Sequence, residues 1–453
     1  MRSINPANNE LIREYPVHSA EDIKVIVQSV HTTWESWKDK TFDDRSGLFR
    51  NAARILRDKK NVYARLMTME MGKLIRESIA EIEKCALVCD FYADHAKEML
   101  KDDEIGSDAI RSFVTFQPLG VILAVMPWNF PFWQVFRFAA PSLMAGNAAV
   151  LKHASNVPGC ALAIEEIFQE AGFPSDLFRT LMIPSHAVGQ VIANRYIAAV
   201  TLTGSEKAGS EVASLAGKMI KKTLLELGGS DPFIVLDDAD LDMAVKTAVT
   251  ARMLNQGQSC IAAKRFIVAE QIAGSFENAL LHIIASLQTG DPMDEATQVA
   301  PLARPDLVDE IERQVNESVA QGARLVIGGK RREGPGCYFE PTILADVKKG
   351  MSVYHEETFG PVIAIIPVAN EAEAIFVAND SEFGLGGCVW TNDLKRGEAV
   401  ARKVVTGAMF VNGMTKSDPR LPFGGVKKSG YGRELGSIGI KEFVNIKTIW
   451  IGA

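Results

Sequence analysis

The chain of 453 residues has little of what marks secreted, disulfide-rich or metal-binding proteins. It contains only six cysteines and seven histidines. So few cysteines in so long a chain do not make a disulfide framework, and they are typical of a reducing compartment. Cys85 and Cys89 lie four residues apart in a helical pattern, but no second ligand pair completes a zinc site. We interpret them as packed thiols and predict no metal site.

Long apolar runs are also missing. The longest, such as Val121 to Met126, are far too short to span a bilayer, and the N-terminus has no apolar signal core. The net charge of -7 argues against a nucleic acid or an anionic membrane as a partner. With 47% apolar residues the chain can bury sizeable cores, and its length favours about three domains. We therefore expect a cytoplasmic protein.

The N-terminal region favours a layer of helices. Ser19 followed by Asp22 is typical of a helix start, and helical spacing continues over about 45–71 and 75–100. Residues 110–117 and 443–451 alternate instead, as half-buried strands do. These two strands could form an ordinary edge hairpin within one domain.

From Gly120 onward the pattern changes to strand, turn and helix, repeated. Apolar strands are predicted at 121–126, 148–151, 179–183 and 198–202, with helices such as 161–170 and 206–219 between them. This alternation predicts right-handed crossovers and a parallel sheet, whose ligands bind at the carboxyl ends of the strands. A second alternating region follows Gly229 and runs to Phe410. The sequence therefore predicts an α/β fold.

A candidate nucleophile lies in the stretch 255–262, just after a predicted helix at 241–254. Cys260 stands there in a turn that is rich in Gly and Gln, where catalytic groups tend to be presented. A lone cysteine is more often a small buried hydrophobe. The polar neighbours make burial less expected here; they are Gln256, Gln258 and Ser259.

A candidate base precedes it. Glu226 ends an apolar strand just before Gly228 and Gly229. A thiol and a carboxylate would form an acyl-enzyme site if they meet in space. Glu226 could instead be a surface residue, paired with Lys221 or Lys222.

No Gly-x-Gly-x-x-Gly follows any predicted strand. The available spacing is Gly204 to Gly209, which opens a predicted helix. A helix N-terminus there could hold a pyrophosphate through free amides, but a glycine after a strand is commonly only a turn.

Several separated motifs, all in family order, resemble the aldehyde dehydrogenase superfamily over nearly the whole chain. They are Met126-Pro127-Trp128-Asn129-Phe130-Pro131, Thr203-Gly204-Ser205, Glu226-Leu227-Gly228-Gly229, Gly257-Gln258-Ser259-Cys260, Glu357-Thr358-Phe359-Gly360-Pro361 and Pro422-Phe423-Gly424-Gly425. The resemblance implies an aldehyde dehydrogenase-like fold with a Rossmann-type parallel-sheet cofactor domain, an α/β catalytic domain and a small oligomerisation arm. The corresponding ranges are 1–106 with 119–228, then 229–411, a returning loop at 412–436, and the arm at 107–118 with 437–453. A homodimer or homotetramer is expected.

The resemblance also implies catalytic roles. Cys260 would attack an aldehyde, with its pKa lowered beside a cationic nicotinamide ring. Asn129 would stabilise the oxyanion together with the backbone N–H of Cys260, although a strand-end cap is the commoner role of such an asparagine. Glu226 would activate water against the resulting thioester, with a pKa raised by its partly apolar surroundings.

Cofactor residues are carried over in the same way. They are Pro127, Trp128, Lys152, Ser155, Thr203, Gly204, Ser205, Leu227, Glu357 and Phe359. Many NAD-preferring relatives place a Glu two or three residues after the lysine that Lys152 matches. Ser155 is neutral and leaves room for a 2′-phosphate, so NADP is the expected cofactor and NAD the weaker alternative.

The substrate end is predicted from Trp133, Arg137 and Ser417, which match the members of the superfamily that oxidise succinate semialdehyde. Arg137 would clamp the distal carboxylate, or it could simply cover a helix surface. Ala262 stands where some relatives have a second, redox-active cysteine, so that disulfide cannot form here.

Other functions stay open at this point. The substrate could be another short semialdehyde acid or a neutral aldehyde. A cofactor-independent thiol hydrolase would need a histidine near Cys260, and none is close in sequence. A non-catalytic structural protein on the same fold is disfavoured by the presence of Cys260, Glu226 and Asn129.

Overall fold

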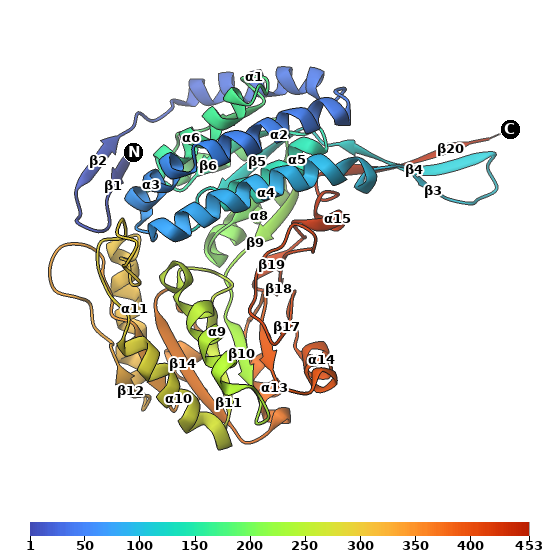
Figure 1. The fold of residues 1–453 in the computed structure, drawn as a ribbon. Coiled ribbons are helices and arrows are strands. Elements are labelled where there is room, and N and C mark those ends of the chain that lie inside the picture. The colour runs from blue at the N-terminus through green and yellow to red at the C-terminus, as the bar shows by residue number, and fades with distance from the viewer. Residues whose placement is uncertain (453) are drawn as a thin grey trace.

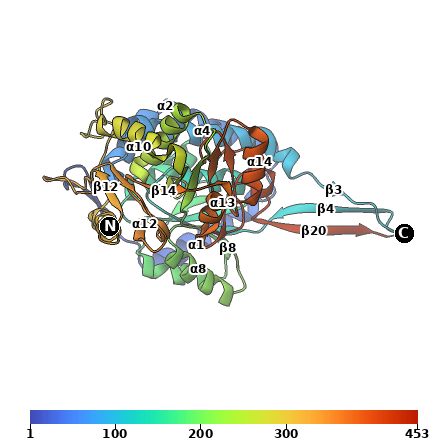
Figure 2. The same ribbon diagram turned by 90° about the horizontal axis from the view of Figure 1, so that it is seen from below.

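The computed structural model describes residues 1–452 and shows two lobes and a projecting arm (Figure 1). Each lobe is built on its own largely parallel sheet, and the arm extends away from both lobes, as the view from below also shows (Figure 2). No helix within residues 1–452 has the length and apolar character to cross a membrane.

The first lobe contains a six-stranded sheet in the order β19-β9-β8-β5-β6-β7. Its strands are Gly430–Tyr431 (β19), Lys222–Glu226 (β9), Ile197–Thr203 (β8), Val121–Met126 (β5), Ala148–His153 (β6) and Phe178–Thr180 (β7). All pair in parallel except β19, which is antiparallel to β9. The connecting helices are Trp133–Met144 (α5), Pro158–Glu170 (α6), Ser185–Ala187 (η1), Val188–Ala193 (α7) and Glu206–Lys218 (α8). The parallel sheet predicted from the apolar runs is confirmed.

Four long helices and a short hairpin cover this sheet (Figure 1). They are Ala20–Trp37 (α1), Phe42–Asp58 (α2), Lys60–Met71 (α3) and Ile75–Met99 (α4), with strands Arg2–Ile4 (β1) and Leu11–Glu14 (β2) at the N-terminus. Ser19 caps α1 as expected, accepting the Asp22 amide at 3.1 Å while the Asp22 carboxylate accepts the Ser19 amide at 2.8 Å. The single helical region expected at 45–71 is divided at Lys59, which leaves helical geometry.

The second lobe contains a seven-stranded sheet in the order β12-β13-β14-β11-β10-β16-β17. Its strands are Arg324–Ile327 (β12), Thr342–Ala345 (β13), Val362–Val368 (β14), Ala263–Ala269 (β11), Asp231–Val235 (β10), Cys388–Trp390 (β16) and Phe410–Val411 (β17). Only β12 is antiparallel to its neighbour. The helices are Leu241–Met253 (α9), Leu254–Gly257 (η2), Glu270–Ala285 (α10), Pro305–Ala320 (α11), Ser352–His355 (α12), Glu371–Asn379 (α13) and Leu394–Lys403 (α14).

The last part of the chain returns from the second lobe to the first. It forms strand Val426–Lys427 (β18), which pairs with Phe383–Gly384 (β15), then β19 and the short helix Gly436–Gly439 (α15). Gly430 of β19 lies opposite Glu226 of β9, so this segment reaches the edge of the first sheet.

The arm is a separate three-stranded sheet in the order β20-β4-β3. Its strands are Val444–Ile451 (β20), Arg111–Pro118 (β4) and Asp103–Glu104 (β3). Strands β20 and β4 pair along their length, from Val444 opposite Pro118 to Ile451 opposite Arg111. Ile446 and Trp450 on β20 are 63% and 55% exposed, which is unusual for large apolar side chains on a strand. The two strands predicted from the sequence therefore do not form a simple edge hairpin within one domain. They belong to a separate three-stranded sheet.

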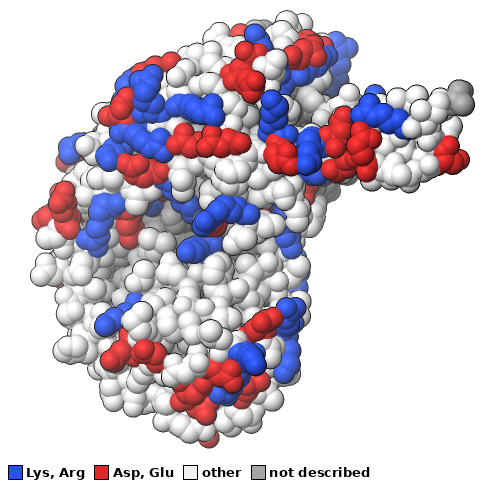
Figure 3. Space-filling model, turned by 45° about the vertical axis from the view of Figure 1, so that its right-hand side comes forward, with Lys and Arg blue, Asp and Glu red and all other residues white. Residues whose placement is uncertain are grey.

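Charge is unevenly distributed on the surface. Figure 3 shows a band of Lys and Arg side chains across the middle of one face, above a broad region that carries almost no charged side chains. The net charge of -7 therefore does not describe the surface locally. A local positive band offers small anions a favourable field even on an acidic protein.

Candidate active site

The loop that presents Cys260 has an unusual backbone. Asn255 and Gln256 both adopt left-handed conformations, with φ of 52° and 56°, and Gly257 follows at 72°. A side chain at Gly257 would collide with the carbonyl of Gly360, so the loop needs glycine there. Such conformations are costly, and hydrogen bonds hold them. The Asn255 side chain donates to the Asn129 carbonyl at 2.7 Å and to the Gln258 carbonyl at 3.2 Å.

The polar neighbours of Cys260 indicated that the thiol is not fully buried, and it is half-buried, but the neighbours themselves lie inside the protein. Gln256, Gln258 and Ser259 are all buried. Their polar atoms are used inside the protein: the Gln258 side chain accepts the Ala303 amide at 2.9 Å and donates to the Asn255 carbonyl at 3.1 Å. Cys260 itself stays half-buried, because these neighbours turn inward and leave the thiol at the surface of a cavity.

Cys260 lines two cavities. The α4 cavity has a volume of about 410 Å³, and its lining includes Glu81, Lys84, Trp133, Arg137, Ser417 and Phe423. The β8 cavity has a volume of about 220 Å³, and its lining includes Pro127, Trp128, Asn129, Thr203, Glu357 and Phe359. The thiol is therefore accessible from both cavities.

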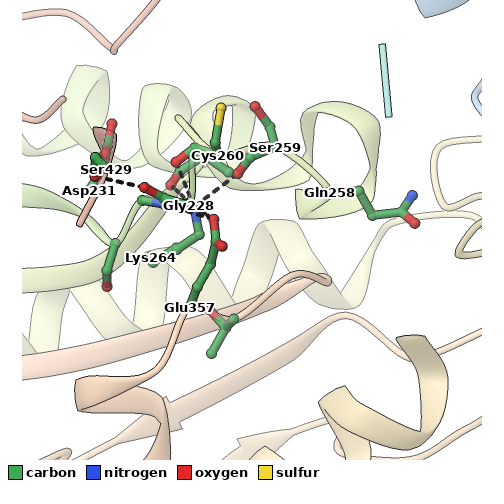
Figure 4. A network of polar contacts seen from close by, with 12 residues as sticks. Gly228, Asp231, Gln258, Ser259, Cys260, Lys264, Glu357 and Ser429 are labelled. Carbon is green, nitrogen blue, oxygen red and sulfur yellow. Dashed lines mark hydrogen bonds and ion pairs between the residues drawn. The ribbon is translucent and has the colours of Figure 1, made fainter. Parts of the chain in front are cut away.

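Lys264, at the start of β11, holds the backbone of the nucleophile loop. Its ammonium donates to the carbonyls of Ser259 and Cys260 at 2.9 Å each and of Ala262 at 3.2 Å. Figure 4 shows these carbonyls converging on Lys264 while the Cys260 sulfur points the other way. Lys264 also lies 3.6 Å from the Glu357 carboxylate, so it links the loop to the lining of the β8 cavity.

The pKa of the Cys260 thiol is raised to about 12, chiefly by burial, while the positive charges of Arg137 and Lys264 lower it. The lowered pKa expected beside a nicotinamide cation is thus not a property of the protein alone. Cys260 rests as a thiol here, and additional positive charge or a proton acceptor is needed to form the thiolate.

Asn129 follows β5 and lies against the nucleophile loop. Its side-chain amide donates to the Gln258 carbonyl at 3.1 Å. An amide nitrogen carries two hydrogens, so one remains for a second acceptor. Asn129 is 5% exposed and lines the β8 cavity together with Cys260. The predicted oxyanion donor therefore lies next to the nucleophile loop.

Glu226 is a buried carboxyl group at the end of β9. It is 2% exposed, and within residues 1–452 neither of its oxygens accepts a hydrogen bond. Burial raises its pKa well above the usual value, Glu434 raises it further, and Arg137 and Arg433 oppose both. The surface pairing considered from the sequence is wrong, since Lys221 bonds the Ile192 carbonyl and Lys222 pairs with Glu442.

Arg137 is buried in the wall of the α4 cavity, at 2% exposure. Its guanidinium pairs with Glu434, donates to the Thr203 hydroxyl at 3.2 Å and lies 4.7 Å from the Phe423 ring centre. It is therefore not an arginine that covers a helix surface. Trp133 and Ser417 line the same cavity, so the three predicted substrate residues come together. Part of the Arg137 charge is already balanced by Glu434.

Most predicted cofactor residues line the β8 cavity. The Trp128 and Phe359 rings meet edge to face at 5.8 Å, and the Glu357 carboxylate accepts the Gly229 amide at 2.9 Å. Thr203, Gly204, Ser205 and Leu227 lie at the carboxyl ends of β8 and β9, as ligand-binding positions of parallel sheets do.

The remaining predicted cofactor residues differ in what they contact and in whether they line the β8 cavity. Ser205 caps α8 by accepting the Ala208 amide at 3.3 Å. A Cβ at Gly209 would lie 2.6 Å from Leu227, so this glycine allows close packing rather than marking a phosphate contact. Lys152 is buried at the end of β6 and Ser155 is exposed just beyond it; neither lines the β8 cavity.

Lys84, Lys264 and Glu434 are part of the site and were not predicted. A lysine within the apolar strand 263–269 is a local sign that could have identified Lys264, because such a charge needs buried partners. Lys84 and Glu434 gave no local sign, since their partners Ser417 and Arg137 are hundreds of residues away in sequence.

Comparison with known proteins agrees with this geometry. Residues 1–449 match the model described as "Aldehyde dehydrogenase family". A Synechocystis protein named "Probable succinate-semialdehyde dehydrogenase [NADP(+)]" is 53% identical over 449 residues, covering 99% of each chain. A Mycobacterium avium protein named succinate-semialdehyde dehydrogenase (NADP+) is 48% identical over 455 residues, covering 100% of this chain and 96% of its own. The crystal structure of a Streptococcus pyogenes succinic semialdehyde dehydrogenase with NADP+ superposes with a TM-score of 0.98 at 40% identity, covering 100% of both chains.

Proposed function

The chain belongs to the aldehyde dehydrogenase family, and we propose that it oxidises succinate semialdehyde to succinate with NADP as its preferred electron acceptor. The observation that carries the proposal is the position of Cys260 between two cavities, one suited to a short polar substrate and one to a dinucleotide. The relatives named above act on this substrate or hold this cofactor by their own names, and they match this chain over its full length.

The residues around the β8 cavity fit a dinucleotide. The cavity offers two aromatic side chains, Trp128 and Phe359, beside the half-buried carboxylate of Glu357, and Ser205 at the start of α8 also lines it. These residues would hold a nicotinamide ring, which would supply the acceptor for the hydride that the aldehyde carbon loses. Ser155 is exposed and neutral and Lys152 lies three residues before it, so a 2′-phosphate meets no acidic side chain from this pair.

Cys260, Asn129 and Glu226 carry out the other steps of the reaction. The Cys260 sulfur bonds to the aldehyde carbon as it loses its proton, and the Asn129 amide with the Cys260 backbone N–H stabilises the oxyanion that forms. Oxidation leaves an acyl thioester on Cys260. Glu226, in its ionised form, takes a proton from water, which attacks the thioester and releases the acid. The raised pKa makes Glu226 a stronger base once it is ionised.

The α4 cavity supplies substrate selection. Trp133, Arg137 and Ser417 line this cavity and not the β8 cavity, and they present an aromatic face, a cation and a hydroxyl. This combination suits an aldehyde that ends in a carboxylate, and another short semialdehyde acid would use the same groups. No histidine lines either cavity within residues 1–452, which disfavours a thiol hydrolase.

Assembly and location complete the proposal. We propose a homodimer or homotetramer held partly by the arm, whose apolar side chains are exposed in the single chain. The six cysteines are all free thiols, which suits the reducing cytoplasm.

The test is the absorbance of reduced nicotinamide with a panel of aldehydes and both cofactors. Reduced cofactor should accumulate only when aldehyde and cofactor are both present, fastest with succinate semialdehyde and NADP. The Cys260→Ala variant should bind NADP but show no turnover. A wild-type enzyme that oxidises butanal as efficiently as succinate semialdehyde would overturn the substrate assignment.

A further inference from the structure

Lys84 is a half-buried cation in the α4 cavity that the function described so far does not use. It lies on α4, far in sequence from every motif, and its ammonium donates to the Ser417 hydroxyl at 2.7 Å. The same ammonium lies 4.1 Å from the centre of the Trp133 ring. Lys84 therefore contacts both of the neutral residues proposed to bind the substrate.

Most of the other charges of the cavity form ion pairs; the exception among the acidic groups of the lining is Glu77, which accepts the Asn255 amide at 2.9 Å. Arg137 pairs with Glu434, and Glu81 pairs with Lys73, with all four side chains almost completely buried. Asp418, next to Ser417, pairs with Arg420 at 2.6 Å. Within residues 1–452, Lys84 forms no ion pair; its recorded polar partner is a neutral hydroxyl.

Exposure separates Lys84 from the two remaining cations of the lining. Arg76 and Lys416 are exposed to solvent, and the Arg76 guanidinium donates to the backbone carbonyls of Glu295 and Thr297. Water screens such charges, whereas a charge within the cavity wall keeps most of its attraction for an anion. Lys84 thus offers an unpaired cation in the cavity lining that is less exposed to solvent than Arg76 and Lys416.

We propose that Lys84 is a specificity-determining residue that binds the distal carboxylate of the substrate, with Ser417 and Trp133 holding its ammonium in place. Arg137 lines the same cavity, and its pair with Glu434 leaves it the smaller share of the recognition. The proposal rests on the function proposed above, because it needs a substrate that carries a carboxylate.

The electrostatic surroundings agree with this assignment. Burial, with a smaller contribution from Arg137 on α5, lowers the pKa of Lys84 to about 8, while Cys85 and Glu81 on α4 and Asp418 on the returning loop raise it. A lowered pKa in a folded protein means that the ammonium lacks a full countercharge. A bound carboxylate supplies that countercharge and favours the protonated form.

The experiment compares kcat/KM for succinate semialdehyde and for butanal, its uncharged analogue, in wild type and in Lys84→Met. The ratio of the two should fall about tenfold to a hundredfold in the variant, the effect of losing one charge-assisted hydrogen bond. Lys84→Arg should restore part of the ratio. Lys416→Met removes the same charge from the exposed rim and should change the ratio less than about threefold, because water screens that lysine.

A binding measurement without turnover completes the test. Succinate should inhibit wild type competitively against the aldehyde, and its inhibition constant should rise by the same factor in Lys84→Met. Lys84→Gln, which keeps a donor for Ser417, should behave like Lys84→Met and covers the case in which the methionine variant does not fold.

The outcomes are distinct. A wild-type enzyme with no preference for succinate semialdehyde overturns the substrate assignment, and the role of Lys84 with it. The role of Lys84 alone is overturned if the wild-type preference survives in Lys84→Met and Lys84→Gln, or if these variants lose equal activity on both aldehydes. Lys84 would then only hold Ser417 in place. A KM for succinate semialdehyde that rises relative to butanal above about pH 8 in wild type, and not in Lys84→Met, supports the proposal.

Discussion

Glu226 combines two properties that rarely occur together, complete burial and the lack of a hydrogen-bond partner in the described chain. An unpartnered buried carboxyl group costs free energy. Burial favours its protonated form over the charged form, and this raises its pKa. Such a group is poor at stabilising a fold and well suited to proton transfer, provided that water reaches it.

For Glu226→Gln we expect hydride transfer to persist while thioester hydrolysis slows by at least about a hundredfold, the usual weight of a general base. A burst of reduced cofactor should then precede slow steady turnover. In wild type the hydrolysis step should accelerate as pH rises through the raised pKa of Glu226, because only the ionised carboxylate accepts a proton. Rapid-mixing absorbance measures both. An unchanged steady rate at neutral pH would exclude the base role.

Ser155 offers a second test at single-residue scale. Ser155→Glu should weaken NADP binding by about tenfold or more, since a carboxylate repels a 2′-phosphate, and should affect NAD less. Ser155→Gln has the same size without the charge and serves as the control. Dissociation constants from the fluorescence of bound reduced cofactors give the comparison. An equal loss for both cofactors contradicts the role assigned to Ser155.

The motifs placed Cys260, Asn129 and Glu226, and the structure brings Cys260 and Asn129 together at one cavity. The sequence did not predict that Gln256, Gln258 and Ser259 are themselves buried, because polarity alone does not reveal whether a side chain finds partners inside. It also could not include Glu434, whose position beside Arg137 depends on how the returning segment packs.

At the scale of elements, α5 is positioned by a carboxylate from another helix. Glu81 of α4 accepts the backbone amides of Phe132 and Trp133 at 2.9 Å each, while its charge pairs with Lys73. The first turn of a helix has free amides and a positive dipole end, so a buried carboxylate there is stabilising. Glu81 thereby fixes the helix that carries both Trp133 and Arg137.

Glu81→Gln should lower the free energy of unfolding by about 3–5 kcal/mol, because the variant leaves Lys73 as a buried charge without its partner. Glu83→Gln removes a carboxylate from the same helix, where it pairs with Lys60 at 40% exposure, and should cost less than about 1 kcal/mol. Urea unfolding followed by tryptophan fluorescence measures both. Similar midpoints for the two variants would refute the structural role of Glu81.

Elements differ in how well the sequence predicts them. Strands β5, β6 and β8 were predicted because both faces are buried, which makes each a continuous apolar run. The hairpin of β1 and β2 was missed because its strands have only 3 and 4 residues and are mostly exposed. Patterns as short as these carry no periodicity.

At the scale of the whole molecule, the arm is a thin sheet that projects away from both lobes (Figures 1 and 2) and packs on the first lobe only at its base, through Phe116 and Val444. A ribbon of two or three strands is marginally stable by itself in water. Exposed apolar side chains such as Ile446 and Trp450 are typical of a surface to which another chain binds, which fits the oligomer proposed above.

The double variant Ile446→Glu with Trp450→Glu should therefore shift the protein to smaller species in sedimentation velocity. Asn445→Glu introduces the same kind of charge on the other face of β20 and should leave the distribution unchanged. An oligomer that withstands the double variant at micromolar concentration would show that the arm does not hold it together.

The sequence did not predict which residues of the two lobes come into contact. The alternation of strands and helices predicted two sheets, but the α4 cavity arises where α4, the nucleophile loop and the returning segment meet, and the β8 cavity lies where both lobes contribute residues around Cys260. Those contacts join residues 50 to more than 300 positions apart, such as Phe132 with Glu81 and Lys84 with Ser417. No local pattern specifies such pairs.

The shared position of Cys260 in the walls of both cavities has a consequence for chemical probes. An electrophile anchored on this sulfur has two directions in which it can be extended. A short acidic tail would direct the molecule toward Lys84, and a flat aromatic tail toward Trp128 and Phe359. Joining both tails to one warhead would give a covalent ligand whose selectivity depends on the distance between two recognition groups rather than on either alone.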